Sequence, residues 1–302
     1  MGRRRVFAAL NGEHDKARLS GIGHEQADAT SFVLHALGEY FVIDSGYINW
    51  SERLRVAGAT HHNLVLVDGE GPSLGLLYVF ADADAWLDEF TDETAWRSAR
   101  VYSEYEGASV SRRVAVVGED YFITEERVAA DAPRTFTWQS HMNAGGDTDG
   151  TFTPLADGAL VERPLAVLRT YLQSLPGPPS FGTRVDEHAA SHSVAGTHNV
   201  LTADVAADEA RFLSLHLVAA EKADLPEVTN ASAGELLINV VGGDGYLDAV
   251  ISSPGGAFEI EPDEDIGTIR SDAELVWVRV DPDAGALIDH QILEGTYFER
   301  DP

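Results

Sequence analysis

The sequence predicts an all-β protein, built as a large antiparallel β-sandwich with a smaller C-terminal sheet layer. Three observations support this fold class. Apolar and polar residues alternate over short stretches, Gly, Asp and Pro separate these stretches, and helical periodicity is rare. Alternation with a period of two turns one face of a strand toward a core. Such frequent turns favour consecutive antiparallel strands over alternating βαβ units.

Four predicted hairpins account for most of the strands. Each holds two apolar stretches separated by a short reversal, and they span residues 32–43, 112–128, 235–253 and 274–293. The reversal of the second is Gly118-Glu119-Asp120, and Gly and Asp also occupy the reversal of the third. The stretch NLVLVDG (63–69) is a further strand that ends at a turn.

A few segments interrupt the strand pattern. ADADAWLDEFTDETAW (81–96) and RPLAVLRTYLQ (163–173) have spacing typical of short helices. SLPGPPSFG (174–182) is rich in Pro and Gly and predicts a crossing loop. After the strand LSLHLVAA we place a boundary, which divides the chain into a sandwich domain over 1–220 and a smaller sheet layer over 221–302.

The charge balance is the most unusual global property of the chain. Fifty acidic residues against 21 basic ones give a net charge of −29, and the only lysines are Lys16 and Lys222. An acidic, lysine-poor composition resembles that of proteins from extreme halophiles, where salt screens self-repulsion. An ordinary acidic protein is the alternative. Nucleic acid is excluded as an expected partner, because phosphate binding needs a basic stripe and none is present.

The sequence lacks cysteines, an apolar stretch long enough to cross a membrane, and the apolar centre of a secretory signal. It has no cysteine, which excludes disulfides, thiolate metal sites and cysteine nucleophiles. No apolar run approaches the roughly 20 residues that span a bilayer, so we expect no membrane partner. The start MGRRRVFAAL is basic but lacks the apolar centre of a secretory signal. We expect a cytoplasmic protein or part of a longer exported chain.

Polar residues at strand ends predict a site near the first hairpin. They are His24, Gln26, Asp28, Asp44, His61 and His62. The first three alternate just before a strand, so their side chains can point the same way. Asp44 ends the return strand, and His61 and His62 precede the strand at 63–69. Imidazole and carboxylate groups in this order suit a metal site or a proton-transfer site, while ordinary turn and capping roles remain open.

Two segments carry a family resemblance. GHEQADATSFVLHALGEYFVIDSG (23–46), followed by THHNLVLVDGEGP (60–72), resembles the heparinase II/III family of polysaccharide lyases. That family has a G-H-x-H-x-D-x-x-S-F-like segment, a glycine turn with D-x-G, and H-N before a V-x-V-D-G strand. Residues 112–128, 136–143 and 268–281 resemble its later sandwich strands, so the resemblance spans most of the chain.

The resemblance implies a β-sandwich lying against an α/α toroid, with an acidic polysaccharide in the cleft. The implied reaction is β-elimination, in which a base removes the C5 proton of a uronic acid and an acid protonates the C4 leaving group. By motif, His24 is the catalytic histidine, and Asp44 and His62 are two ligands of a structural zinc. Gln26 replaces a histidine ligand of zinc-containing members. Because glutamine is a poor zinc ligand, we expect a hydrogen-bonded cluster without zinc.

Other side chains are candidates for binding the substrate. Arg53 and Arg55, with Arg112 and Arg113, suit a uronate or sulfate because arginine binds such anions bidentately. Surface ion pairing is their alternative role. His141 follows a strand and faces either the cleft or the core. The run HAASH (188–192) has the i,i+4 spacing of a metal-binding helix but lacks the zincin Glu, and we interpret it as a chance match.

Two functions from different classes fit these observations. The first is a polysaccharide lyase, or the sandwich half of one, acting on a uronic-acid glycan. The second is a carbohydrate-binding or assembly module without catalysis. The toroid, which supplies a catalytic tyrosine in the family, is absent from this sequence, so a separate toroid chain or a homo-oligomer is the expected partner. Tyr47 and Tyr102 are available locally, but core or turn roles are expected for both.

Overall fold

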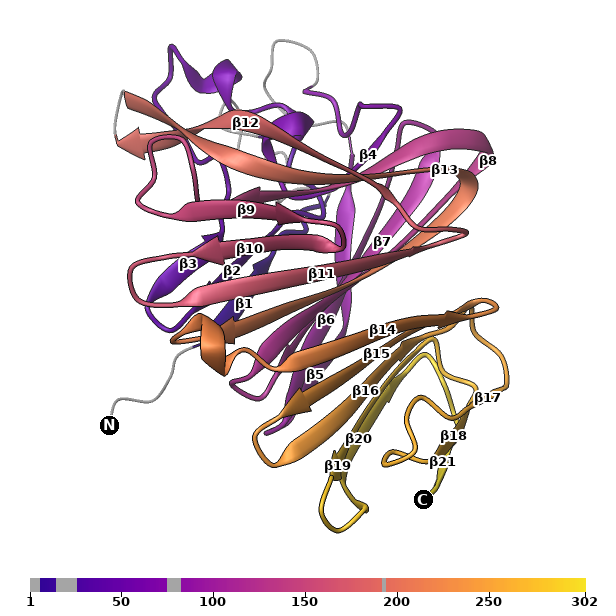
Figure 1. Ribbon diagram of the computed structural model, residues 1–302. Coiled ribbons are helices and arrows are strands. Elements are labelled where there is room, and N and C mark those ends of the chain that lie inside the picture. Colours follow the sequence, from indigo (N-terminus) through magenta and orange to yellow (C-terminus); the bar gives the residue numbers. More distant parts are fainter. Residues whose placement is uncertain (1–5, 15–25, 75–82, 192–193) are drawn as a thin grey trace. The chain divides into compact units, whose positions relative to one another are not determined.

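The computed structural model describes residues 6–14, 26–74, 83–191 and 194–302 (Figure 1). Nearly all of its regular structure is antiparallel β-strand, which confirms the predicted fold class. The chain divides into two compact units, residues 1–222 and 223–302, and each is described by itself. In the described part of the chain, no helix has the length and apolar character needed to cross a membrane.

The described residues of the first unit form one network of 13 antiparallel strands. Two short 3₁₀ turns, η1 (Arg53–Arg55) and η2 (Ala59–His61), lie between its third and fourth strands. The strands are β1 (Val6–Leu10), β2 (Phe32–Ala36), β3 (Glu39–Val42), β4 (Val65–Val67), β5 (Ala85–Asp92), β6 (Trp96–Tyr105), β7 (Ala108–Val117), β8 (Tyr121–Met142), β9 (Thr151–Leu155), β10 (Gly158–Glu162), β11 (Val167–Leu175), β12 (Ser180–Ser191) and β13 (Val194–Ala219).

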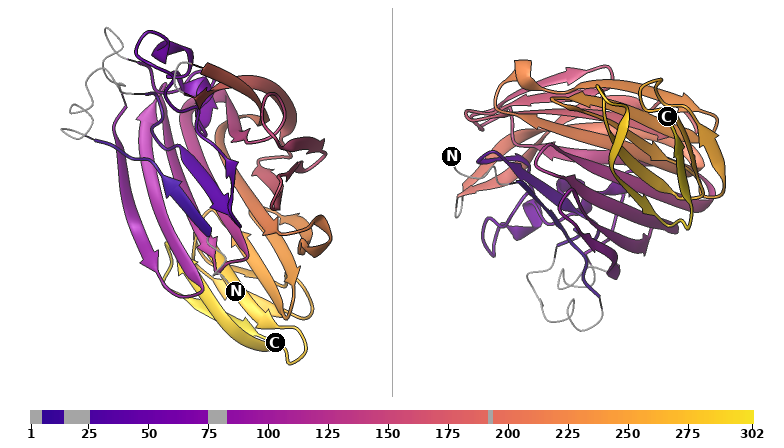
Figure 2. Two further views of the ribbon diagram at one scale, coloured as in Figure 1. Left: turned by 90° about the vertical axis from the view of Figure 1, so that its left-hand side faces the viewer. Right: turned by 90° about the horizontal axis from the view of Figure 1, so that it is seen from below.

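Two long strands, β8 and β13, connect the rest of this unit. The first half of β8 lies between β7 and the second half of β13, and its second half pairs with β4 and with the first half of β13. The second half of β13 also pairs with β11, whereas its first half pairs with β12. The strands β1–β3 and β9–β11 thereby lie in opposite layers (Figure 2).

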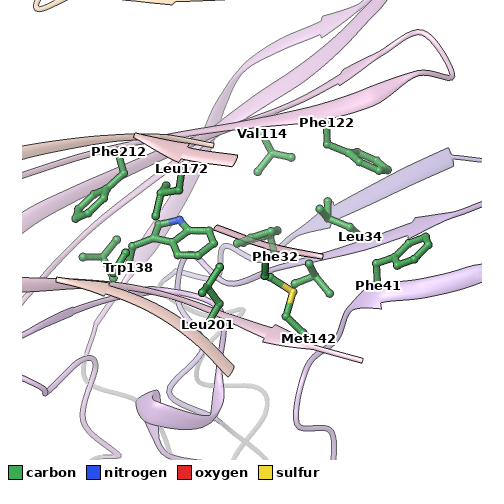
Figure 3. Close-up of a cluster of buried hydrophobic side chains, with 14 of the residues drawn as sticks. Phe32, Leu34, Phe41, Val114, Phe122, Trp138, Met142, Leu172, Leu201 and Phe212 are labelled. Carbon is green, nitrogen blue, oxygen red and sulfur yellow. The ribbon is translucent and has the colours of Figure 1, made fainter. Parts of the chain in front are cut away.

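The core of the first unit fills the space between these layers. Figure 3 shows buried side chains pointing toward one another from both layers, and Trp138 lies near the centre of the view. The labelled residues come from six strands and are Phe32, Leu34, Phe41, Val114, Phe122, Trp138, Met142, Leu172, Leu201 and Phe212. Alternating strand positions supply them, since successive residues of a strand point to opposite faces.

The second unit contains a five-stranded and a three-stranded sheet. The strands of the first are β14 (Glu227–Ala233), β15 (Leu236–Gly243), β16 (Tyr246–Ser252), β19 (Leu275–Asp281) and β20 (Ala286–Leu293); those of the second are β17 (Phe258–Ile260), β18 (Thr268–Ser271) and β21 (Phe298–Asp301). A 3₁₀ turn, η4 (Lys222–Asp224), precedes β14. Ile238, Val278 and Ile269 belong to one buried cluster, so side chains from the two sheets share a core.

The predicted hairpins are confirmed as β2–β3, β7–β8, β15–β16 and β19–β20. In the first of them, Leu37 and Gly38 have φ angles of 55° and 90°. Left-handed conformations at both central residues match the twist of a two-residue hairpin turn. Glycine adopts this conformation without steric cost, so the L-G pair in the sequence encodes the reversal.

Both predicted helices are wrong. The described part of 81–96 contains β5 and the first residue of β6, and most of 163–173 lies in β11. Apolar residues three and four apart resembled a helical face, but each segment pairs with neighbouring strands. Pairing partners far away in the sequence decide such ambiguous segments. The predicted crossing loop at 174–182 shrinks to residues 176–179, because β11 and β12 extend into it.

Candidate functional site

Asn63 holds the first hairpin against strand β8. Its side chain is fully buried. The amide nitrogen donates to the carbonyl oxygens of Phe32 (2.7 Å) and Ile43 (2.8 Å), and the amide oxygen accepts the backbone N–H of His141 (2.6 Å). Three backbone groups from β2, the end of β3 and β8 are therefore satisfied by one side chain. This fixes the position of the histidines that precede Asn63.

His62 lies on one side of this segment, next to two carboxylates. It is fully buried, and its Nδ1 is 2.8 Å from Oδ2 of Asp44. Burial opposes a charged imidazole, but the hydrogen bond and charge of Asp44, with the charge of Asp28, raise the pKa of His62 above its usual value. The same hydrogen bond overcomes burial and lowers the pKa of Asp44. The two residues form an ion pair in which His62 is fully buried and Asp44 is partly exposed.

Asp28 completes this cluster. Its carboxyl group is partly buried, and the loss of solvent raises its pKa to about 6, an effect that His62 opposes and Asp44 reinforces. Two carboxyl groups beside one imidazole thus have pKa values shifted in opposite directions. Such a division is typical of groups that exchange protons near neutral pH. The sequence placed Asp28 in line with His24 and Gln26 but assigned it no role.

Gln26 joins the same cluster through the backbone. Its Nε2 donates to the carbonyl oxygen of Gly46 (3.0 Å), while the N–H of Gly46 donates to Oδ1 of Asp44 (2.9 Å). Hydrogen bonds therefore run from Gln26 through Gly46 and Asp44 to His62. Oε1 of Gln26 and Nε2 of His62 are buried without a hydrogen-bond partner. The cluster is compact, because the turn that carries Gly46 folds back over it.

These residues do not fit a zinc site. Both carboxylate oxygens of Asp44 already accept hydrogen bonds, and an amide stands where a third strong ligand is needed. Among the described residues, no group of three or more His, Asp or Glu side chains is placed to hold a metal ion. His24, the predicted catalytic residue, lies outside the described residues.

His61 lies on the other side of the segment and contacts β12. Its Nδ1 is 2.8 Å from Oδ1 of Asp186, whose Oδ2 accepts a hydrogen bond from Arg184 (2.5 Å). Burial opposes the ionised form of Asp186, but these two partners lower its pKa well below the usual range. Arg184 also donates to Oε1 of Gln139 (2.9 Å), and Nε2 of Gln139 donates to the carbonyl oxygen of His62 (2.6 Å). The network fastens η2 to β8 and β12.

A row of three histidines lies beside this network. Nδ1 of His141 on β8 is 2.8 Å from Nε2 of His198 on β13, and Nδ1 of His198 is 3.1 Å from Nδ1 of His188 on β12. Burial lowers the pKa of all three, to about 4 for His198. Oδ2 of Asp186 lies 3.8 Å from Nδ1 of His141, but its charge does not outweigh burial, so the row is uncharged at neutral pH.

Two of the histidines in this row, His141 and His188, were considered in the sequence analysis. His141 is fully buried in the row that it forms with His198, and its contact with a substrate stays a prediction. The described part of the run HAASH, residues 188–191, lies in β12 and not in a helix, so the helical spacing of a metal-binding motif does not apply to it. His188 instead meets His198 across the β12–β13 pair, a contact that spacing within the run does not indicate.

The candidate arginines differ in how they are paired. Arg112 and Arg113 form buried ion pairs with Glu126 and Glu125, so both are structural. Arg55 is bound through two nitrogens to Glu187, at 3.1 and 2.5 Å. Arg53 has no carboxylate partner among the described residues, and its guanidinium lies over the ring of Trp50. Of the four, Arg53 alone is placed to accept an external anion.

Sequence reasoning missed the contribution of β12. Arg184 and Asp186 are more than 110 residues from the His61-His62-Asn63 segment, and the position of β12 beside β13 brings them to His61, while His188 meets His198. Gln139 was missed for the same reason. Asp28 had a local signal, since it continues the alternation of His24 and Gln26 before a strand. Trp50 had none, because an exposed aromatic side chain cannot be recognised from a loop sequence.

Comparisons with known proteins agree on one family. The family model described as "Heparinase II/III-like, C-terminal" matches residues 6–263. The structure of heparinase III is similar to this chain, with 16% sequence identity and a TM-score of 0.60. The match covers 82% of this chain and 39% of the heparinase III chain. Heparan sulfate lyase HepC from Pedobacter heparinus, at 13% identity and a TM-score of 0.60, is matched over 72% of this chain and 35% of its own. A search of curated sequences finds no match.

Proposed function

Because the chain belongs to the heparinase II/III-like family, we propose that it is the β-sandwich part of a polysaccharide lyase. The proposed reaction is β-elimination on a uronic-acid glycan. The observation that supports it most directly is His62 between Asp44 and Asp28, in the order of the family motif and with shifted pKa values. A site that removes one proton and supplies another needs groups that change protonation near neutral pH.

The roles of the residues follow from their surroundings. We assign His24 as the catalytic histidine, acting as a base or neutralising the substrate carboxylate. We propose that the Asp44–His62 pair and Gln26 belong to the same site, and that their hydrogen bonds replace zinc. Asp28, with a pKa of about 6, is the group in the cluster best suited to buffer protons at neutral pH. No step in this scheme uses a metal.

The rest of the active site must come from elsewhere. The chain spans less than two fifths of heparinase III and HepC. We propose that an α/α toroid completes the cleft, supplied by a further stretch of polypeptide, by a separate chain or through a homo-oligomer. The toroid would provide the tyrosine and much of the sugar groove that the family resemblance implies.

The high negative charge sets the conditions for the test. A chain with a net charge of −29 repels a polyuronate in dilute buffer. At about 1 M salt the screening length falls to roughly 3 Å, so only local contacts remain effective. We therefore expect binding and turnover to be strongest at high salt, which also agrees with a halophilic origin.

A lyase assay at molar salt tests the proposal. The substrates are alginate-type, heparan-type and other polyuronates, and ultraviolet absorbance reports the new C4–C5 double bond. We expect His24→Ala to abolish product formation while circular dichroism and the melting temperature stay unchanged. His35→Ala is the matched control, because His35 lies in β2 and its ring stacks with Phe7 away from the cluster. Equal activity of wild type and His24→Ala would refute the assignment.

One observation favours a second function. Gln26 occupies a histidine position of zinc-containing members and bonds to the backbone instead. We propose as the alternative a carbohydrate-binding or assembly module that has kept the sandwich and lost catalysis. Saturable glycan binding without product, at all salt concentrations and with a toroid partner present, would favour this function. Product formation that depends on His24 would exclude it.

A further inference from the structure

We propose that Trp50 and Arg53 form a binding subsite for one acidic sugar residue. In this subsite the indole of Trp50 packs on the apolar face of a pyranose ring, and the guanidinium of Arg53 pairs with its carboxylate or sulfate. The inference depends on the proposed function only for the identity of the glycan, because it concerns binding and not catalysis. Both residues lie in the loop that connects Asp44 to His62.

The two side chains form one surface. Cζ of Arg53 lies 3.8 Å from the ring centroid of Trp50, and Nη1 of Arg53 donates to the carbonyl oxygen of Trp50 (2.7 Å). Trp50 is 54% exposed and the neighbouring Leu54 is 43% exposed. Trp96, Trp138 and Trp277 are all buried in comparison. A large aromatic side chain left in water beside a stacked cation is typical of a surface that a ligand covers.

The loop that presents this surface is rigidly held. Oδ1 of Asn49 accepts the N–H groups of Ser51 (2.9 Å) and Glu52 (3.1 Å). Ile48 and Val56, which flank the loop, are fully buried. Further along, the ion pair of Arg55 with Glu187 fastens the loop to β12. Trp50 and Arg53 are therefore pre-organised, so less conformational entropy is lost when a ligand binds.

The charge of Arg53 indicates an anionic ligand. Most described arginines have a carboxylate partner, whereas Arg53 has none among the described residues despite the excess of acids. Its Nε is buried without a hydrogen-bond partner. An arginine has five N–H donors in a planar fork that matches a carboxylate or sulfate. Even Glu52, its sequence neighbour, pairs with Arg55 instead.

A hollow that described residues of the first unit line does not offer this combination. It has a volume of about 600 Å³, lies on β6–β8 and is lined in part by Glu104, Asp131 and Glu209. These carboxylates repel a polyuronate, so the hollow does not compete for the same ligand. Nucleic acid also combines flat rings with anions, but its binding needs several phosphate contacts along a basic stripe. A single guanidinium suits one sugar carboxylate better.

Fluorescence and calorimetric titrations test the subsite directly. The probes are alginate-type and heparan-type tetrasaccharides, with cellotetraose as the neutral counterpart and a short single-stranded oligonucleotide as the competing class. We expect acidic tetrasaccharides to bind and to change the emission of the exposed Trp50. Trp50→Ala should weaken their binding at least tenfold. Arg53→Gln should weaken it about tenfold and remove the preference over cellotetraose.

A matched control separates the subsite from general charge effects. Arg97→Gln makes the same change at an exposed arginine on β6 that also lacks a carboxylate partner among the described residues and donates to the carbonyl oxygen of Gly118. We expect its affinity to equal that of the wild type. Unchanged affinity in Trp50→Ala and Arg53→Gln, an equal loss in Arg97→Gln, no binding of any acidic tetrasaccharide, or tighter binding of the oligonucleotide would each overturn the inference.

The inference and the proposed function fail in different ways. If acidic tetrasaccharides bind through Trp50 and Arg53 but no C4–C5 double bond forms even with a toroid partner present, the subsite stands and the lyase proposal fails. If product forms with the same KM in wild type, Trp50→Ala and Arg53→Gln, the lyase proposal stands and the subsite is refuted. The absorbance assay and the titrations therefore answer separate questions on the same protein samples.

Discussion

His62 and His141 are both fully buried histidines on either side of Asn63, yet their pKa values shift in opposite directions. Burial opposes the charge on both rings. His62 has Asp44 at 2.8 Å, and this carboxylate outweighs burial, whereas His141 has the neutral ring of His198 at the same distance. Burial lowers the pKa of both rings, and the charge of the nearby groups decides whether the pKa of each ends above or below its usual value. One side of the site is an ion pair, and the other is an uncharged row.

The largest effect on stability is expected when Asn63, the side chain between His62 and His141, is removed. Asn63→Ala leaves two buried carbonyl groups and one buried N–H group without partners. We expect the free energy of unfolding to fall by about 4 kcal/mol, since each unsatisfied buried group costs about 1–3 kcal/mol. Urea unfolding measures this loss. Asn143→Ala is the control, because its amide bonds only the exposed Tyr40 carbonyl, and a similar loss in that variant would contradict the explanation.

The second-largest expected effect is a loss of stability at low pH, caused by the row of His141, His188 and His198. Unfolded histidines take up protons below about pH 6.5, whereas the folded row resists protonation because its pKa values are lowered, to about 4 for His198. The unfolded state therefore binds more protons, and stability falls as the pH decreases from about 6.5 to 4. His198 alone should account for about 3 kcal/mol at the acid end.

Urea unfolding at several pH values checks this slope. Asp28 acts in the opposite direction, because its raised pKa makes the folded state bind a proton first and partly offsets the loss. His198→Gln should reduce the proton uptake on unfolding by about one per molecule between pH 6.5 and 4. A slope identical to that of the wild type would show that this row is not the origin of acid sensitivity.

Replacing Asp44 should lower the pKa of His62, so that His62 becomes an uncharged buried histidine like His141. In Asp44→Asn, His62 keeps its burial but loses the carboxylate, so its pKa should fall below the usual 6.5. We expect a loss of about 2 kcal/mol near neutral pH. The wild-type contribution of His62 is present below pH 6.5 and disappears as the pH rises through its raised pKa. Titration of the imidazole signals by NMR checks the shift, and an unchanged His62 pKa would contradict it.

The smallest effect is expected at the proposed sugar subsite. Trp50 is 54% exposed, and neither Trp50 nor Arg53 belongs to the cluster of buried side chains described for the first unit. Trp50→Ala and Arg53→Gln should each change the free energy of unfolding by less than about 0.5 kcal/mol. Urea unfolding of both variants checks this expectation. A fall in the free energy of unfolding of more than about 2 kcal/mol would show that Trp50 and Arg53 stabilise the fold and do not serve mainly to bind a ligand.

The hairpins and the first half of the site were predictable because their signals are local. Alternation and turn residues revealed β2–β3 and β7–β8. The motif around Gln26, Asp44 and His62 also lies within 40 residues, and the structure brings those three together. The segments 81–96 and 163–173 were misread as helices, because their strand character comes from pairing with distant partners.

The sequence by itself determined the fold class, the family and the residues that face one another across the first hairpin. Period-two alternation, turn chemistry and short-range spacing are enough for these features. Only the tertiary structure decided the charge states and the second side of the site. It brought Asp186 and Arg184 of β12 to His61, and His188 of β12 to His198. A pKa depends on burial and on neighbours a few ångströms away, and neither is encoded in the distance between residues along the chain.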